Sequence, residues 1–432
     1  MSVIDLADTS RAAKATHADL TVVGGAGHVG IPLVLSFAAK GLTVNVNDLN
    51  RDGLATLKAG RLPFIEYGAD ELLTNALRDN KLIFTSTPGE ISRSGPVIVT
   101  IGTPVDEYLD PSVVAFDRSL ESLVERVRPG QLLVLRSTVF PGMTDRLARQ
   151  LERQGRLDVD LAYCPERIVQ GQSLEELEQL PQLVAGATRR AADRAAALFS
   201  VICPKVLFLK PVEAELAKLF CNAWRYINFA IANQFYVMAQ HFEADFHRIY
   251  HALREDYPRM RSLARPGFAA GPCLLKDTMQ LGAFNHGSFV LGQAAMMINE
   301  GLPYLLVQDI KRAYPLSDMT VGILGMAFKG DNDDTRESLA FKMRKLLELE
   351  ARRVLCTDPY VPDTGLTPLA EVLDQADLFV VGTPHSCYRG LTFRRPVVDI
   401  TGVITGNPPA AIPPAVADPA PRTDVVVGEG QA

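Results

Sequence analysis

Short apolar runs alternate with amphipathic stretches through the first part of the chain. The runs at residues 20–23, 43–47, 81–85, 97–101, 132–135 and 157–163 have the length of buried strands, and residues 32–39 have a helical pattern. Strands that alternate with helices predict a parallel, doubly wound sheet. Ligands of such sheets bind beyond the carboxyl ends of the strands, so the residues that follow these runs are candidates for function.

A long amphipathic segment from Val212 to Gln240 comes next. Its apolar positions recur every three or four residues and predict a core-facing side, made of Leu216, Leu219, Ala223, Ile227, Ile231 and Phe235. Polar residues at the same spacing form a second face, made of Glu215, Lys218, Asn222, Arg225 and Asn228. Aromatic residues flank this polar face, so we expect it to line a pocket or a subunit interface; a solvated face is the alternative. The helical pattern continues through residues 245–253.

A second strand and helix alternation follows, with strands expected at 318–324, 353–356, 378–381 and 397–400 and a helix at 339–349. It lacks a glycine fingerprint, so its ligand need not be a dinucleotide. The chain is therefore predicted to be an α/β protein with two Rossmann-like doubly wound domains joined by a long central helix. The predicted parts are an N-terminal extension (1–18), a cofactor-binding Rossmann domain (19–210), a central helical domain (211–315), a second Rossmann-like domain (316–406) and a flexible tail rich in proline and alanine (407–432).

Composition and charge restrict the function. The 432 residues carry a formal net charge of −6, which argues against a nucleic-acid binder or an anionic membrane surface as partner. No long uncharged apolar run and no signal-peptide pattern is present, so we expect a cytoplasmic protein that does not bind membranes. The six cysteines show no metal-ligand spacing, so we expect reduced thiols and no metal site.

A glycine fingerprint, Gly25-Ala26-Gly27-His28-Val29-Gly30, joins the first expected strand to the first helix. Asp48 ends the second strand, where an acid binds the adenosine ribose and favours NAD over NADP. A glycine turn without a ligand is the alternative. Two threonines follow later strands and are expected at the cofactor crevice, or as simple helix caps. The candidate cofactor-binding residues are Gly25, Gly27, His28, Val29, Gly30, Asp48, Thr103 and Thr138.

Cys273 follows a loop of small residues, Pro266 to Pro272, and precedes Lys276 and Asp277. An accessible thiol with a proton carrier one helical turn away has the layout of a nucleophile; a buried structural cysteine is the alternative. Lys218 beside this thiol would stabilise a thiolate or an alkoxide. Glu166, after the strand at 157–163, holds or deprotonates a water, or is an ordinary loop glutamate. Lys329 and Arg336 are candidate phosphate-binding residues, or solvated ones.

These residues belong to a series of motifs in one order: GAGHVG, Ser137-Thr138-Val139, Cys164-Pro165-Glu166-Arg167, Ala214-Glu215-Leu216-Ala217-Lys218 with Asn222, Cys273 with Lys276-Asp277, and Ala327-Phe328-Lys329 with Asp334-Thr335-Arg336. From about residue 20 to 404 the chain resembles the UDP-glucose/GDP-mannose dehydrogenase family. The resemblance implies that the 6-hydroxyl of a UDP-sugar is oxidised twice by NAD⁺ to a carboxylate, as in polysaccharide biosynthesis. It also implies a homodimer formed through the central helical domain.

The resemblance further implies a role for each matching residue. Cys273 forms a thiohemiacetal and then a thioester, and Glu166 activates the water that hydrolyses the thioester. Asp277 and Thr138 handle the first proton through a water, while Lys218 and Asn222 stabilise oxyanions. Arg259 resembles an arginine that reaches the substrate of the partner subunit. The implied substrate-binding residues are Glu166, Arg167, Lys218, Asn222, Arg225, Arg259, Lys329 and Arg336.

The substrate signals disagree. Cys-Pro-Glu-Arg at 164–167 and the segment from Asn222 to Asn228 resemble enzymes for N-acetylhexosamine nucleotides, whereas Lys276-Asp277 resembles the UDP-glucose enzymes. We favour a UDP-N-acetylhexosamine such as UDP-GlcNAc or UDP-ManNAc, with UDP-glucose as the alternative. A two-electron hydroxyacid dehydrogenase would have no use for Cys273. A nucleotide-sugar-binding protein with impaired catalysis is a further alternative, because Phe268, Ala269, Ala270 and Pro272 stand in a loop that is usually richer in glycine.

Overall fold

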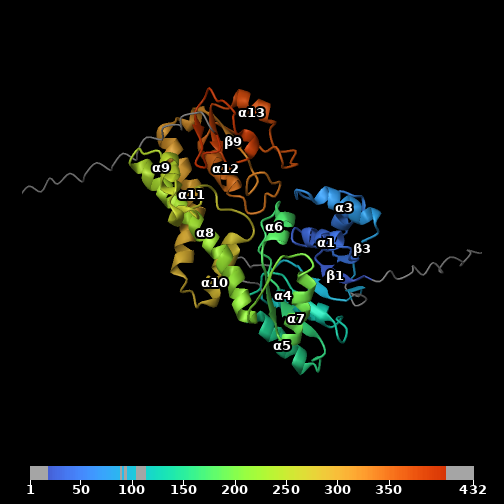
Figure 1. Cartoon of the computed structure of the whole chain (residues 1–432). Helices are drawn as coiled ribbons and strands as arrows, with labels where there is room; N and C mark the ends of the chain where they lie inside the picture. The colour runs from blue at the N-terminus through green and yellow to red at the C-terminus, as the bar shows by residue number, and fades with distance from the viewer. Residues whose placement is uncertain (1–17, 88–89, 92–94, 104–112, 405–432) are drawn as a thin grey trace, which may run out of the picture. The chain divides into compact units, whose positions relative to one another are not determined.

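The structure is a computed structural model that describes residues 18–87, 90–91, 95–103 and 113–404 (Figure 1). The chain forms two compact units, one of residues 1–224 with 273–290 and the other of 225–272 with 291–432. The predicted flexible tail, and the extension up to residue 17, lie outside the described residues. The domain boundaries proposed from the sequence stay predictions.

The first unit contains an eight-stranded sheet in the order β3-β2-β1-β4-β5-β6-β7-β8. Its strands are β1 (Leu20–Val23), β2 (Val44–Asn47), β3 (Leu82–Thr85), β4 (Val97–Val99), β5 (Leu132–Leu135), β6 (Asp160–Tyr163), β7 (Gln182–Gly186) and β8 (Val206–Phe208). The first six strands are parallel, and β1 pairs with β2 in the register Leu20↔Val44. This order reverses beside β1, which makes the sheet doubly wound as predicted and places a ligand crevice at that point.

Helices cover both faces of this sheet. They are α1 (Gly30–Ala39), α2 (Arg51–Lys58), α3 (Ala69–Arg78), α4 (Val113–Val124), α5 (Met143–Arg153), α6 (Ser173–Gln179) and α7 (Arg189–Phe199). The same unit contains α10 (Leu274–Phe284), whose Leu281 packs with Leu219 and Ala223. Neighbouring residues of one strand point to opposite faces, so Leu132 packs with the cluster of α1, α3 and α7, and Leu133 packs with the cluster of α4 and α5. Because both faces are covered, the central strands β4 and β5 are buried and apolar along their whole length.

The sheet continues beyond the six expected strands, and β7 departs from their parallel order. This strand runs antiparallel to β6 in the register Ala162↔Gly186, and β8 then runs parallel to β7. The connection between them carries only the short helix α6, which packs on α1 and does not return the chain to the amino end of β6. As a result, residues 164–181 stay at the carboxyl end of the sheet, where the cofactor crevice lies.

The long helix of the pattern is α8 (Pro211–His241), with α9 (Phe246–Arg254) and α11 (Val290–Ala313) after it. Helical structure does not continue into 245–253 without a break. The chain turns at Glu243, whose φ is +53°, and the Asp245 carboxylate then caps α9 by accepting the backbone N–H of His247 at 2.8 Å. Asp245 is therefore a helix start rather than a helix interior residue.

The predicted core face of α8 is also partly wrong. Ile231 and Phe235 are 37% and 40% exposed, and the packed positions in this half are Ala232 and Tyr236, which contact Leu302 and Leu306 of α11. Phe220 and Trp224, interpreted as too apolar for exposure, are 54% and 57% exposed. Small residues on one side let α11 approach, so the larger apolar side chains face outward from the chain.

The second unit contains a four-stranded parallel sheet in the order β10-β9-β11-β12. Its elements are β9 (Thr320–Leu324), α12 (Leu339–Glu350), β10 (Arg353–Thr357), α13 (Leu369–Gln375), β11 (Leu378–Val381) and β12 (Val397–Val398), with short 3₁₀ turns η2 (Pro258–Met260), η3 (Leu316–Asp318) and η4 (Ser386–Tyr388). The second Rossmann-like sheet is thus confirmed. In the part of the chain that the structure describes, no helix is long and apolar enough to cross a membrane.

Candidate active site

The glycine loop between β1 and α1 fits a dinucleotide. At Gly30 an added Cβ would lie 2.2 Å from the Gly24 carbonyl oxygen, so only glycine lets α1 start this close to the loop. At Gly27 an added Cβ would meet only the Gly24 oxygen, at 3.4 Å, so this residue borders open space. A close helix start beside an open loop is the shape that receives a pyrophosphate at a helix N-terminus.

Asp48 stands at the end of β2 and binds the same loop. Its carboxylate accepts the backbone N–H of Ala26 at 2.9 Å and that of Asn50 at 2.8 Å. The residue is half-buried, so lone pairs remain for a ribose diol. His28 packs on the Phe64 ring with centroids 3.9 Å apart, and its Nδ1 lies 2.8 Å from the Gln170 amide nitrogen.

The two candidate threonines lie at the carboxyl edge of the first sheet. Thr138 is half-buried just beyond β5. Thr103 follows β4, and its hydroxyl accepts a hydrogen bond from the Lys276 ammonium at 2.8 Å. Lys276 therefore ties the start of α10 to this edge, a role that the sequence analysis did not assign to it.

Cys273 is the residue immediately before α10, and its side chain is exposed. Its carbonyl oxygen accepts the backbone N–H of Asp277 at 2.9 Å, so the two residues are one helical turn apart, as predicted. The alternative of a buried structural cysteine is wrong here. It describes Cys164 instead, which is fully buried and whose thiol pKa is raised by that burial to about 12.

Asp277 meets the polar face of α8 (Pro211–His241). Its Oδ2 accepts a hydrogen bond from the Asn222 side-chain amide at 2.5 Å. Its Oδ1 lies 3.4 Å from the Lys276 ammonium, is fully buried, and accepts no hydrogen bond from any described residue. A buried carboxylate oxygen that accepts no hydrogen bond can accept one from a group that is not part of the chain.

Lys218 lies one turn before Asn222 on the same helix and is 9% exposed. Within the described ranges, no hydrogen bond or ion pair joins its ammonium to another group. The ammonium nitrogen is not among the fully buried polar atoms that lack a partner, so the aliphatic stem is covered while the charged end still meets solvent. Such a cation is complementary to an oxyanion formed on a substrate.

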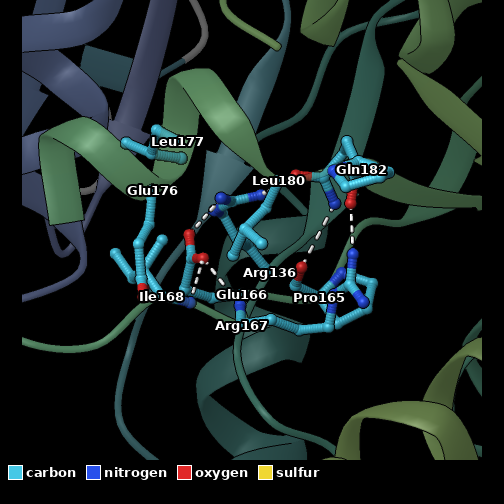
Figure 2. A pocket seen from close by; sticks show the side chains of 10 residues that line it. Arg136, Pro165, Glu166, Arg167, Ile168, Glu176, Leu177, Leu180 and Gln182 are labelled. Carbon is cyan, nitrogen blue, oxygen red and sulfur yellow. Dashed lines mark hydrogen bonds and ion pairs between the residues drawn. The ribbon is translucent and has the colours of Figure 1, made fainter. Parts of the chain in front are cut away.

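Glu166 follows β6 and is 8% exposed. Its Oε1 accepts the backbone N–H groups of Arg167 and Ile168, at 2.7 and 2.9 Å, and its Oε2 pairs with the Arg136 guanidinium (Figure 2). These donors fix the orientation of the carboxylate and shape the turn after Pro165. The role of Glu166 as a general base stays a prediction.

Arg136 is the neighbour of Glu166 that the sequence analysis missed. It follows β5 directly, is 2% exposed, and also donates to the Cys164 carbonyl oxygen at 3.2 Å and to the Gln182 side chain at 2.9 Å. Figure 2 shows it beside Glu166 in a small pocket under α6. A charged residue that ends an apolar strand was the available signal, because such a residue is buried only with a partner.

The remaining substrate candidates are distributed over several elements. Arg225 on α8 is exposed, and the exposed Arg259 guanidinium lies 5.5 Å from the Tyr257 ring centroid. The Arg167 guanidinium donates to the Pro181 carbonyl oxygen. Lys329 is half-buried in the loop after β9.

Arg336 forms a two-pronged ion pair with Asp334, with Nε–Oδ1 at 3.0 Å and Nη2–Oδ2 at 2.6 Å. A phosphate would compete with this carboxylate for the guanidinium. Among the described residues, no cluster of His, Cys, Asp or Glu is suited to a metal ion.

Comparisons with known proteins agree with this geometry. Residues 18–202 match the NAD binding domain of the UDP-glucose/GDP-mannose dehydrogenase family, residues 212–300 its central domain and residues 322–405 its UDP binding domain. A UDP-N-acetyl-D-mannosamine dehydrogenase of Pyrococcus horikoshii is 30% identical over 383 residues, which cover 85% of this chain and 90% of that protein. The protein of that name from Escherichia coli K12 is 25% identical over 422 residues, covering 90% and 99%.

Solved structures show the same likeness. The UDP-D-ManNAc dehydrogenase from Pyrococcus horikoshii superposes with a TM-score of 0.83 at 28% identity, covering 91% of this chain and 97% of that one. A UDP-glucose dehydrogenase from Pyrobaculum islandicum has a TM-score of 0.82 at 27% identity, covering 90% and 96%.

A dinucleotide domain, a second nucleotide domain and a helix between them define a nucleotide-dependent oxidoreductase. The chain belongs to the UDP-glucose/GDP-mannose dehydrogenase family and is an NAD-dependent UDP-sugar dehydrogenase. The predictions of the family, of NAD and of an oxidoreductase are confirmed. The alternative of a hydroxyacid dehydrogenase is wrong.

Proposed function

We propose that this enzyme oxidises the C6 hydroxyl of UDP-N-acetyl-D-mannosamine to a carboxylate through a thioester on Cys273. The observation that carries the proposal is the start of α10: an exposed thiol, and one turn later a carboxylate with a buried vacant oxygen held by Asn222. The choice of sugar is supported by relatives named UDP-N-acetyl-D-mannosamine dehydrogenase along nearly their whole length. The segment from Asn222 to Asn228 agrees with that choice.

In the first half of the reaction the chain handles one proton and one developing oxyanion. Bound NAD⁺ accepts a hydride in each of the two oxidations. The vacant Oδ1 of Asp277 takes the hydroxyl proton through a water that Thr138 also holds. Lys218 and Asn222 donate to the oxygen as negative charge develops on it. The product of this half is an aldehyde at C6.

In the second half Cys273 keeps the aldehyde in the site. Its thiolate adds to C6, and the new oxyanion is protonated to give a thiohemiacetal. Loss of a second hydride and a proton leaves a thioester. A water positioned by Glu166 attacks the carbonyl carbon, the C–S bond breaks, and the carboxylate leaves while the thiolate is restored. The sum is one alcohol and one water converted to one carboxylate, with four electrons removed.

Substrate binding is assigned to the remaining candidate residues. Lys329, in the UDP binding domain, binds the diphosphate, and Arg336 joins it by exchanging Asp334 for a phosphate. Arg167 and Arg225 contribute to the sugar and phosphate environment. A catalytic thiol needs a reducing compartment, which supports action in the cytoplasm.

We also propose a homodimer formed through α8. Its exposed apolar residues Ile231, Phe235 and Met238 are four and three residues apart, which is typical of a helix–helix seam, and Trp224 lies seven residues before Ile231. In chain order, the exposures of Trp224, Ile231, Phe235 and Met238 are 57%, 37%, 40% and 49%. Phe242, directly after the helix, is 81% exposed. Monomers rarely leave such a stripe uncovered. The exposed Arg259 then reaches the substrate of the partner subunit.

One assay tests the chemistry. Purified enzyme is incubated with NAD⁺ and one of UDP-N-acetylmannosamine, UDP-N-acetylglucosamine, UDP-N-acetylgalactosamine, UDP-glucose or GDP-mannose, and NADH is counted per sugar consumed. We expect about two NADH per sugar, with the highest kcat/KM for UDP-N-acetylmannosamine. Cys273→Ala is expected to abolish acid formation while NAD⁺ affinity is kept. Normal acid production by that variant would refute the thioester, and sugar binding without turnover would indicate a binding protein.

UDP-glucose is the second candidate substrate. It is favoured by Lys276-Asp277, which resembles the UDP-glucose enzymes, and by the TM-score of 0.82 to a UDP-glucose dehydrogenase. A higher kcat/KM for UDP-glucose than for the N-acetylated sugars in the same panel decides for it.

A further inference from the structure

Two loops of the second unit contact each other immediately before the cysteine. The first is the cysteine loop, residues 266–272. The second is the nucleotide loop, residues 327–338, which lies within the UDP binding domain and carries Lys329. The nucleotide loop is closed on itself, because the Phe328 backbone N–H donates to the Asp334 carbonyl oxygen at 2.9 Å and the Ser338 hydroxyl donates to the Ala327 carbonyl oxygen at 3.1 Å.

The contact between the loops is made at Gly271. Its φ is +101°, and an added Cβ would lie 2.6 Å from Cδ2 of the Phe328 ring. Its backbone N–H donates to the Glu337 carbonyl oxygen at 3.3 Å. Glu337 itself has a φ of +54°, unusual for a residue other than glycine. Both arms of the nucleotide loop therefore touch one residue, and the Phe328 ring fills the space that a side chain would take.

The beginning of the cysteine loop is fixed independently. The Asn233 side-chain amide on α8 pairs with both backbone groups of Gly267, accepting the N–H at 2.8 Å and donating to the carbonyl oxygen at 3.0 Å. Asn299 of α11 (Val290–Ala313) accepts from Asn233 at 2.9 Å and donates to the Tyr226 carbonyl oxygen at 3.0 Å. Both asparagines are fully buried, so this anchor is rigid.

With one end anchored, a shift of Gly271 is passed to Cys273, two residues further along. We propose that Phe328 is a positioning residue for Cys273, through which occupation of the nucleotide loop by a UDP group places the thiol for reaction. The inference rests on the proposed role of Cys273 as nucleophile. A UDP group that binds Lys329 moves Phe328 or restricts its motion. Because Gly271 packs directly against the Phe328 ring, the change is passed to Gly271. A displacement of about 1 Å at a nucleophile costs on the order of a hundredfold in rate.

The first test measures the thiol directly. The full-length enzyme is alkylated with iodoacetamide, with and without saturating UDP, and the modification of Cys273 is followed by peptide mass spectrometry. Because UDP is proposed to change the position of the thiol, it is expected to change the rate of Cys273 alkylation about fivefold or more in the wild type and in Phe328→Tyr, which keeps the ring. In Phe328→Ala the effect is expected to vanish although UDP still binds. The exposed Cys221 on α8 is the internal reference.

A UDP effect that persists in Phe328→Ala would show that UDP shields the thiol directly, and would overturn the inference. The absence of any UDP effect in the wild type would do the same. The second test measures how the C6 aldehyde divides between further oxidation and release. Phe328→Ala and Gly271→Ala are expected to lower kcat more than they raise KM for the UDP-sugar. Both variants are also expected to release aldehyde, which an aminooxy reagent traps. Ile310→Val, in the core of the same unit and outside both loops, is the control for destabilisation and is expected to release none.

The outcomes separate this inference from the function on which it rests. If Cys273→Ala forms acid normally, the thioester proposal fails whatever Phe328 does. If Cys273→Ala is inactive and Phe328→Ala behaves as wild type in both tests, only the positioning role fails.

Discussion

Two polar groups at the site make no hydrogen bond within the described part of the chain. The Lys218 side chain is largely buried, and its ammonium has no hydrogen bond or ion pair there. Oδ1 of Asp277 is fully buried and accepts no hydrogen bond, although the Lys276 ammonium lies 3.4 Å away. Desolvation of this oxygen costs free energy of folding that a hydrogen bond would offset. Under the proposed function, both groups bind the substrate.

Removing the Lys218 charge separates catalysis from stability. We expect Lys218→Met to lower kcat/KM about 10²–10³-fold, because one oxyanion donor is lost. The melting temperature should change little, because methionine keeps the buried apolar stem and the ammonium has no described protein partner to lose. Initial rates and thermal melts measure the two effects. Lys210→Met, at an exposed position before α8, is the control and should change neither. A drop in melting temperature for Lys218→Met would indicate a structural role instead.

Asn222→Asp tests the pairing with Asp277. The amide donates to Oδ2 at 2.5 Å, and a carboxylate in its place would face another carboxylate. The two would share a proton at neutral pH, which blocks Asp277 as a base. We expect the acid limb of the kcat/KM profile to move to higher pH by about one unit or more, measured between about pH 6 and pH 10. Asn222→Ala should lower the rate without moving the limb; an equal shift in both variants would contradict the pairing.

At this scale the sequence predicted the residues whose types are chemically distinctive. Cys273, Asp277 and Asn222 were chosen from spacing on a helix and from motif resemblance, and the structure brings Asn222 and Asp277 together. Arg136 and Lys276 were missed because their partners, Glu166 and Thr103, come from distant segments. No periodicity of one helix or strand contains such pairs.

The helix α8 divides its polar face among different tasks. Glu215 caps another helix, Asn222 pairs with Asp277, and Asn228 holds a loop by accepting the Ala264 backbone N–H at 3.1 Å. The prediction of one continuous pocket or interface was therefore too simple. Residues that share a helical stripe meet different neighbours along a helix of 31 residues. The stripe could be predicted from the sequence, whereas the division of tasks required the fold.

Glu215 links α8 to the start of α5. Its carboxylate accepts the backbone N–H of Gly142 at 2.6 Å, and the N–H and hydroxyl of Thr144 at 2.8 and 2.6 Å. Glu215→Ala leaves these buried donors unpaired and should cost about 2–4 kcal/mol in the free energy of unfolding. Urea titration followed by circular dichroism measures this loss. Thr144→Val removes one donor and should cost less.

The same variant has a predicted pH dependence. Burial raises the pKa of Glu215 above its usual value of 4.5 in the folded enzyme. The stability that wild type gains from this group is therefore fully present below about pH 4.5 and is lost as the pH rises through the folded-state pKa. The difference between wild type and Glu215→Ala should shrink from acid to neutral pH. A difference that grows over that range would mean that the carboxylate is stabilised by its donors more than burial disfavours it.

The two Rossmann-like units of the molecule use the same local device with different results. In the first, Asp48 accepts one N–H from the loop after β1 and stays half-buried. In the second, Asp358 at the end of β10 accepts two, from Met326 and Ala327, at 2.7 and 3.0 Å. Asp358 is 9% exposed as a residue, and its carboxylate also bonds the buried His385 at 2.9 Å.

This difference explains why only one unit takes a dinucleotide. Burial by itself opposes ionisation of Asp358, but His385 and the surrounding backbone N–H groups together lower its pKa below the usual range. The carboxylate is thus an anion fully occupied by the protein, and a ribose has nothing to bind. The sequence showed the second α/β pattern and its missing glycine fingerprint. It did not show that the equivalent acid was consumed internally, because His385 comes from beyond β11, far along the chain.

The exposed stripe of α8 leads to a prediction about the assembled enzyme. Phe235→Glu with Met238→Glu should convert a dimer to a monomer of 47.1 kDa, because burying the new carboxylates in a seam is costly. Sedimentation velocity measures the mass, and Leu349→Glu, at an 82% exposed leucine of α12, should leave it unchanged. If Arg259 binds the partner's substrate, Arg259→Ala should raise the KM for UDP-sugar while the dimer stays intact. The monomeric variant should show the same raised KM. A monomer with the wild-type KM would support the interface along α8 but contradict the role of Arg259 in the partner's site. An unchanged mass would mean that the interface lies elsewhere.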